Sequence, residues 1–226
     1  MSPKGRPIEA NPYFNSRFDK IAVVVREFSV GRKISDPGIY GEPYIVSFAV
    51  DEDGIEEGRV DFNSLPFPNV RRGDTISFDG QGHLIYGPKN PGEFLAYSIL
   101  FMECDQDIRE IGHRIREIVK SPATKAILDG VSSTLAAATG SGAIIGAAVS
   151  LVDDLALIVA TELEKNRDDQ LYRRNGTLLR GSSPPFDILR TYKSGNDYIT
   201  SCKTSVIPLS ESNLLGAQPG TIFNLG

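Results

Sequence analysis

The stretch from Gly130 to Val152, GVSSTLAAATGSGAIIGAAVSLV, contains no charged residue, although 23% of the chain is charged. It is long enough to cross a bilayer. Alanine, glycine and serine dominate it, and a turn predicted at Thr139–Gly142 would fall at the middle of a single span. We therefore interpret it as the inner part of a helical hairpin, which either packs as the core of a small water-soluble bundle or opens towards a membrane.

The period of the apolar residues predicts helices around this stretch. Ile108, Ile111, Ile115 and Ile118 recur every three or four residues, as on one face of an amphipathic helix. Ser121 followed by Pro122 is typical of the start of a second helix, which we expect to run to about Thr139. A third helix is expected to continue to about Lys165. Together they predict a three-helix insertion over about residues 106–166.

The chain on both sides of the insertion has the alternating pattern of β-strands. The expected strands are KIAVVVREF, PYIVSFAV, GRVDF, DTISFD, FLAYSILFME, NGTLL, PFDILRTY and DYITSCKTSVI. The turn Asp51–Gly54 is predicted to close a hairpin, and a brief strand is predicted at His83–Tyr86. We predict a mainly β, antiparallel sandwich over residues 19–206, with a loose lead-in at 1–18 and a loop-like tail at 207–226.

Composition excludes several classes of function. The net charge of −5 argues against binding of nucleic acid, and two cysteines exclude a disulfide framework. The N-terminus has no apolar signal-peptide core, so we expect a cytoplasmic protein, with peripheral membrane association as an alternative. No nucleophile elbow, zinc-binding helix or phosphate-binding glycine loop is present in the sequence, so we expect a protein that is not an enzyme.

Three segments together resemble the C2 domain, a calcium- and lipid-binding β-sandwich. The first is IAVVVREFSVGRKISDPGIYGEPYIVSFAV, with Asp36 in a loop and a Pro-Tyr entry to the next strand; the second is FLAYSILFMECDQD, with Asp105 and Asp107; the third is NRDDQL, with Asp168 and Asp169. The resemblance covers roughly residues 19–107 and 166–206. It implies that these loops gather at one end of the sandwich and that their carboxylates chelate calcium.

The resemblance sets one condition on the strands. Loops between successive alternating strands fall at alternating ends of the sheets. If His83–Tyr86 were a full strand, Asp36 and Asp105 would therefore lie at opposite ends, so the calcium site requires that stretch to be minor. Calcium takes six to eight oxygen ligands, and five clustered aspartates would repel one another without a cation. The alternative is that these aspartates only cap helices and turns.

The sequence thus predicts a calcium-binding module that docks on an anionic membrane surface or a protein partner. Calcium would neutralise Asp36, Asp105, Asp107, Asp168 and Asp169. The apolar contact would come from the hairpin, through Ile144, Ile145, Val149, Leu151 and Val152. The alternative is a structural or assembly protein without metal, which forms homo-oligomers through the helical insertion.

Overall fold

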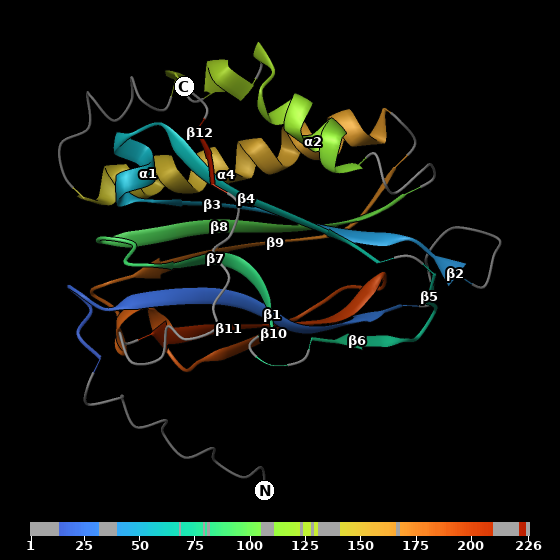
Figure 1. Cartoon of the computed structure of the whole chain (residues 1–226), viewed down its shortest axis with the longest axis horizontal. Helices are drawn as coiled ribbons and strands as arrows, with labels where there is room; N and C mark the ends of the chain where they lie inside the picture. The colour runs from blue at the N-terminus through green and yellow to red at the C-terminus, as the bar shows by residue number, and fades with distance from the viewer. Residues whose placement is uncertain are drawn as a thin grey trace, which may run out of the picture.

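The structure is a computed structural model of the 226-residue chain. The residues described are 14–31, 40–67, 69–78, 80, 82–104, 111–122, 124–127, 129–130, 141–165, 168–209 and 222–224. The fold is mainly β, with two five-stranded antiparallel sheets in two layers and the helices above the second one (Figure 1).

The first sheet is organised around β1, which pairs with β11 on one side and with both β6 and β7 on the other. β10 extends the sheet beyond β11. The bounds are β1 (Lys20–Val30), β6 (Thr75–Ser77), β7 (His83–Lys89), β10 (Thr191–Ser194) and β11 (Ile199–Leu209). β6 and β7 are both antiparallel to β1, so they run in the same direction. They lie along β1 like one strand that is interrupted at residues 78–82.

The second sheet has the order β12-β4-β3-β8-β9. Its strands are β3 (Pro43–Asp51), β4 (Arg59–Pro66), β8 (Phe94–Glu103), β9 (Asp169–Leu179) and β12 (Ile222–Asn224). Every residue of β8 is buried, which confirms the prediction that FLAYSILFME is a strand covered on both faces. A short pair, β2 (Tyr40–Gly41) with β5 (Val70–Arg71), lies outside both sheets.

Two apolar cores hold the layers together. The first lies between the sheets and contains Phe28 of β1 and Phe101 of β8, whose ring centroids are 5.1 Å apart. The second lies on the outer face of the second sheet, where it joins β3, β4 and β8 to the helices. Because β8 contributes to both cores, apolar residues stand on both of its faces and do not alternate with polar ones.

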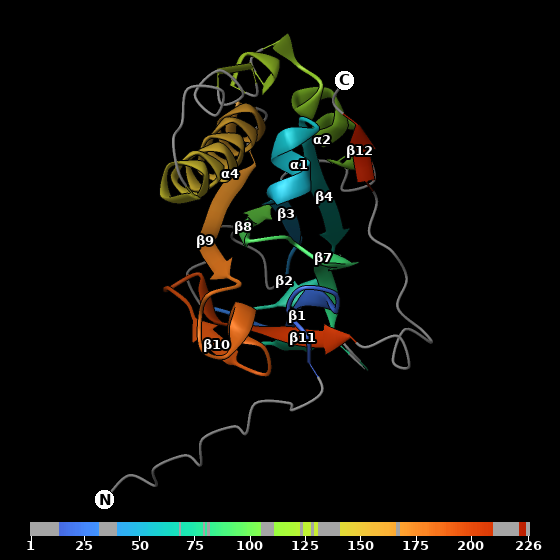
Figure 2. The ribbon, with the colours of Figure 1, turned by 90° about the vertical axis from the view of Figure 1, so that its left-hand side faces the viewer.

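The helical insertion lies between β8 and β9, as predicted. Its described part holds α2 (Ile111–Val119), a helical segment over residues 122–130 without 123 and 128, and α4 (Ser141–Glu164). α4 lies across the outer face of the second sheet (Figures 1 and 2). The predicted turn at Thr139–Gly142 is wrong in its second half, since Ser141 and Gly142 already belong to α4.

A further helix stands where a tight hairpin turn was predicted. β3 and β4 do pair as antiparallel neighbours, but α1 (Glu52–Glu56) connects them. The Asp51 carboxylate accepts a hydrogen bond from the Gly54 backbone N–H at 2.7 Å, which satisfies a donor in the first turn of the helix. The predicted loop-like tail also contains structure, because β11 extends to Leu209 and β12 follows at Ile222–Asn224.

Candidate functional site

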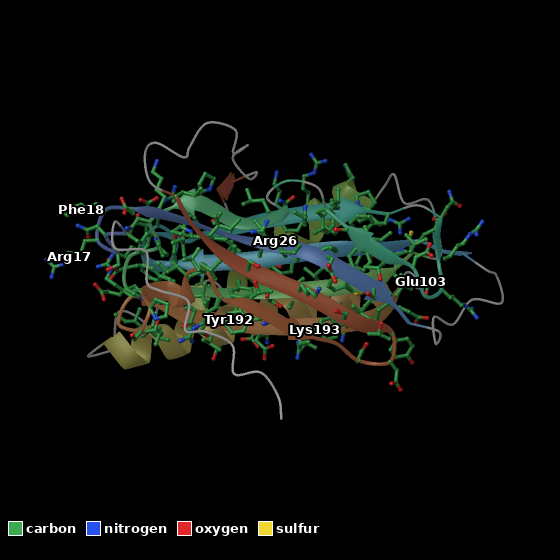
Figure 3. All side chains as sticks on the ribbon, turned by 90° about the horizontal axis from the view of Figure 1, so that it is seen from below. Arg17, Phe18, Arg26, Glu103, Tyr192 and Lys193 are labelled. Atoms are coloured by element: carbon green, nitrogen blue, oxygen red, sulfur yellow. The ribbon has the colours of Figure 1, made fainter. Side chains whose placement is uncertain are left out.

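The ends of β1 and β8 lie at the same end of the two sheets. Phe28 and Phe101, each two residues before the end of its strand, are in contact across the layers. Pro43, at the start of β3, pairs with Glu103 at the end of β8. We call this the loop end. Figure 3 shows Glu103 there, at the opposite end of the molecule from Arg17 and Phe18.

The sequence led us to expect that the loops of Asp36 and Asp105 lie at one end only if His83–Tyr86 is a minor strand, and the structure corrects this condition. The stretch His83–Tyr86 belongs to a full seven-residue strand, β7, yet the described residues that flank the loops of Asp36 and Asp105 lie at one end. The reason is that β7 continues the direction of β6 instead of reversing it. Asp36, Asp105 and Asp107 themselves lie outside the described residues.

Asp168 and Asp169 stand at the start of β9, at the loop end. Asp169 is exposed and pairs in register with Glu103, while Asp168 is only 1% exposed. The Tyr44 hydroxyl donates a hydrogen bond of 2.8 Å to Asp168 Oδ2. Burial and the nearby Asp168 carboxylate raise the pKa of Tyr44, so Tyr44 keeps its proton and acts as a donor.

Glu103 is a further acidic residue of the loop end, which the C2 resemblance does not include. The residue is 1% exposed, and burial of a carboxylate is costly unless it is compensated. Glu103 is the last residue of FLAYSILFME, so the apolar pattern assigns it to the strand and not to the loop that follows. An acidic residue at the end of such an apolar run is the signal in the sequence that points to it.

The described part of the loop end does not form a complete metal site. Among the described residues, no group of three or more histidine, cysteine, aspartate or glutamate side chains is placed to hold a metal ion. Glu103, Asp168 and Asp169 have the carboxylate chemistry that calcium prefers. The remaining oxygen ligands would have to come from Asp36, Asp105 and Asp107.

The predicted contact residues on α4 divide into two groups. Leu151 and Val152 are buried in the core under the helix, so they cannot touch a membrane or a partner in this arrangement. Ile144, Ile145 and Val149 are half-buried and pack against the edge of the same core. The opposite side of the helix carries Leu157, which is 55% exposed.

α4 is less covered than a core helix. Gly142–Glu164 is long and apolar enough to cross a membrane by length and composition, and 39% of its most apolar stretch is buried. A groove of about 510 Å³ follows its first half. Small residues of α4 form one wall and the preceding helical segment forms the other; the lining residues are Ile127, Gly130, Ala143, Gly146, Ala147, Ser150 and Asp154.

A second buried polar cluster lies at the opposite end of the sheets. Asp51, 1% exposed, accepts hydrogen bonds from Gly54 N–H and from the Tyr86 hydroxyl, both at 2.7 Å, and pairs with Lys89 at 2.8 Å. Lys89 also pairs with Asp61 at 3.0 Å. Burial lowers the pKa of Lys89, but the two carboxylates outweigh it and the net shift is upward. Each partner is engaged within the cluster, so we assign it a structural role.

Comparison with protein-family models, with curated proteins and with solved structures found no match for this chain.

Proposed function

We propose that the protein is a non-enzymatic, C2-like module that binds calcium at the loop end and docks on an anionic membrane surface or a protein partner through its helical insertion. The observation that carries the proposal is the convergence at one end of three parts of the chain. These are the described flanks of the Asp36 loop, the flank of the Asp105 and Asp107 loop, and the acidic start of β9.

The strand order supports the C2-like part of the proposal. With β6 and β7 counted as one interrupted strand, and the short strands β2, β5 and β12 set aside, eight strands remain. They divide into two sheets of four, and the first-to-second and fifth-to-sixth connections lie at the same end. The resemblance requires both connections there, because they carry the predicted ligands.

Calcium would act on the charge of the loop end. Carboxylates gathered at one end of the sheets would repel one another, and Glu103 and Asp168, at the described strand ends, are both 1% exposed. A divalent cation would reduce this repulsion and lower the negative potential that an anionic membrane surface meets. The insertion leaves the sheets at the same end, between β8 and β9, so it would be carried towards that surface.

Calorimetric titration of calcium into the full-length protein tests the metal site. We expect a saturable heat in wild type that is absent with chelator. Asp169→Asn should weaken binding about tenfold, because affinity depends on the number of charged ligands. Asp53→Asn, at an exposed position of α1 at the other end of the sheets, is the matched control and should bind as wild type does. The absence of calcium-dependent heat in wild type would overturn the calcium site.

Co-sedimentation with vesicles of phosphatidylcholine and about 30% phosphatidylserine tests docking separately. We expect wild type to sediment with calcium and to stay in solution with chelator. Ile145→Ser should reduce vesicle binding while leaving the calcium heat intact, whereas Thr161→Ser, on the exposed side of the same helix, should change neither. If wild type remains in solution under both conditions, docking on an anionic membrane is wrong even where calcium binds.

The groove beside α4 favours a second candidate, the assembly protein without metal. Gly146 faces the groove, and a Cβ added there would meet no atom within 4 Å. A helix from another copy can approach such a surface closely. Light scattering should then show an oligomer in wild type that Gly146→Leu reduces to a monomer. Glu164→Leu, at the far end of α4, is the control. A monomer in wild type would contradict this candidate.

A further inference from the structure

Polar side chains join the two sheets along one side of the sandwich. β9 is the edge strand of the second sheet and β10 is the edge strand of the first, and Figure 2 shows β9 above β10 on the same side. Arg174 of β9 donates a hydrogen bond of 2.9 Å from Nη1 to Ser194 Oγ of β10. The Tyr172 hydroxyl lies 2.6 Å from the same Ser194 oxygen. We call these three residues, with Tyr192 of β10, the side seam.

Arg174 is a half-buried cation without an acidic partner in the described part of the chain. Its contacts there are the Ser194 hydroxyl and the Tyr192 ring, whose centroid is 5.3 Å from Arg174 Cζ. The neighbouring Arg173 differs, because it pairs with Asp153 of α4 at 3.3 Å. A guanidinium has five N–H donors, so most of those of Arg174 remain for an acceptor from outside the described residues.

Tyr192 fixes the orientation of this guanidinium. The Tyr192 hydroxyl donates a hydrogen bond to Asp187 Oδ2, and Asp187 Oδ1 pairs with Arg190 at 2.8 Å. Burial and the Asp187 carboxylate raise the pKa of Tyr192 to about 12, so the hydroxyl keeps its proton. The ring is thereby held against one face of the guanidinium. A guanidinium positioned in this way presents the N–H groups of its edge, the geometry that binds two oxygens of an oxyanion.

The hydroxyls of the side seam supply one further donor. Tyr172 and Ser194 carry one hydroxyl proton each, and their mutual hydrogen bond uses one of the two, whichever residue donates it. The bond from Arg174 uses only an acceptor position of Ser194 Oγ. The other proton has no acceptor among the described residues, so one hydroxyl next to the guanidinium can donate to a ligand.

The charge around the side seam favours a phosphate over a carboxylate. Arg190 is balanced by Asp187. Arg174 and the exposed Lys193 have no carboxylate at ion-pair distance in the part of the chain that the structure describes, and so add two positive charges to a chain of net charge −5. Figure 3 shows Tyr192 and Lys193 at this edge of the first sheet. A phosphate group carries a charge of about −1.5 to −2 and has three acceptor oxygens, whereas a carboxylate has one charge and two oxygens.

We propose that the side seam is an anion-binding site for a phosphate group, in which Arg174 is the anchor and the Tyr172–Ser194 pair supplies a hydroxyl donor. The phosphate oxygens accept from the edge of the guanidinium and from the free hydroxyl proton. The phosphate belongs either to a lipid headgroup or to a soluble compound, since the chemistry of recognition is the same. The site is separate from the loop end and from the groove of α4, and it does not depend on calcium.

NMR titration of inorganic phosphate into the ¹⁵N-labelled full-length protein tests the site, with chelator present and ionic strength held constant with chloride. We expect saturable shifts of the Arg174 Nε–H and Ser194 amide signals with a Kd of about 1 mM, for two charge-assisted hydrogen bonds and one from a hydroxyl. Arg174→Lys keeps the charge but loses the planar fork, so binding followed at Ser194 should weaken about tenfold. Arg173→Lys, on the side of β9 that faces α4, is the matched control and should bind as wild type does.

Three results would overturn the site. They are the absence of saturable shifts in wild type, shifts at Ser194 that Arg174→Lys leaves unchanged, and equal shifts when chloride replaces phosphate. Because chelator is present throughout, failure of the calcium site has no effect on this titration.

Co-sedimentation with vesicles, again with chelator, distinguishes the two sources of the phosphate. The vesicles contain phosphatidylcholine and about 30% phosphatidic acid, whose headgroup is a phosphate monoester. Sedimentation of wild type but not of Arg174→Lys would identify a lipid headgroup. Wild type that binds inorganic phosphate and stays in solution would identify a soluble phosphate compound. Equal sedimentation of both proteins would show that the vesicles bind elsewhere and would overturn the lipid as the ligand of this site.

Discussion

His83 is expected to make this protein sensitive to mild acid. It is the first residue of β7, half-buried beside Phe78, and its Nε2 is a buried atom that has no hydrogen-bond partner among the residues that the structure describes. Burial lowers the pKa of His83 to about 4, from an ordinary value of 6.5. Because the folded state resists protonation, the unfolded state takes up the proton first, and stability falls as the pH drops below about 6.5.

The magnitude follows from these two pKa values. Between pH 7 and pH 5 the free energy of unfolding should decrease by about 1.8 kcal/mol, and the full loss below pH 4 is about 3 kcal/mol. Urea unfolding at pH 7 and pH 5 measures the decrease. In the His83→Leu variant, the decrease in the free energy of unfolding between pH 7 and pH 5 should be smaller than in wild type by about 1.8 kcal/mol. His113→Leu, on the exposed side of α2, should keep the wild-type decrease. If His83→Leu and wild type lose equal stability over this range, the burial argument is wrong.

Two further predictions concern the cores. Lys89→Met should lower the free energy of unfolding by about 3 kcal/mol in urea, because it leaves the buried Asp51 carboxylate without its cation; a cost below about 1 kcal/mol would show that water reaches Asp51. Leu155→Ala should cost about 3 kcal/mol in the same assay, since Leu155 is buried under α4, whereas Leu157→Ala, at the exposed side of the helix, should change stability by less than about 0.5 kcal/mol.

The strands that could be predicted best from the sequence are those whose burial dictates the distribution of apolar residues along them. FLAYSILFME is β8 from its first residue to its last, because a strand covered on both faces has apolar residues throughout. The segment PYIVSFAV likewise lies within β3, and DYITSCKTSVI lies within β11 except for its first two residues, Asp197 and Tyr198. Mainly β structure in antiparallel sheets, with helices between β8 and β9, could therefore be predicted from periodicity alone.

Other features depend on residues far apart in the chain. The sequence predicts Asp51 as part of a hairpin turn because Asp-Gly is a common hairpin signal. In the structure it caps α1, and Tyr86 and Lys89, over thirty residues later, complete its partners. The common direction of β6 and β7 also could not be predicted from local sequence, because it is set by the pairing of both strands with β1. The Tyr44–Asp168 hydrogen bond is equally invisible to local sequence, since it joins residues on β3 and at the start of β9.

The acidic residues of α4 limit how this helix can be placed in a membrane. The second half of the helix contains Asp153, Asp154, Glu162 and Glu164. Asp153 is held at the sheet by Arg173 and Asn175 of β9. At the centre of a bilayer each acidic residue would cost about 2.5 to 3.5 kcal/mol, which opposes a transmembrane orientation of the whole helix.

The first half of α4, Ser141–Val152, has no charge, but at 1.5 Å per residue it is about 18 Å long, against a hydrocarbon thickness of about 30 Å. It is too short to span and long enough to lie in the interface. Separation of Leu151 and Val152 from the sheet would cost about 4 kcal/mol, which burial of the same side chains among lipid chains would offset. The charges of α4 therefore allow one membrane arrangement, in which the first half of the helix lies in the membrane interface. Asp153 would then be the point at which the helix stays attached to β9.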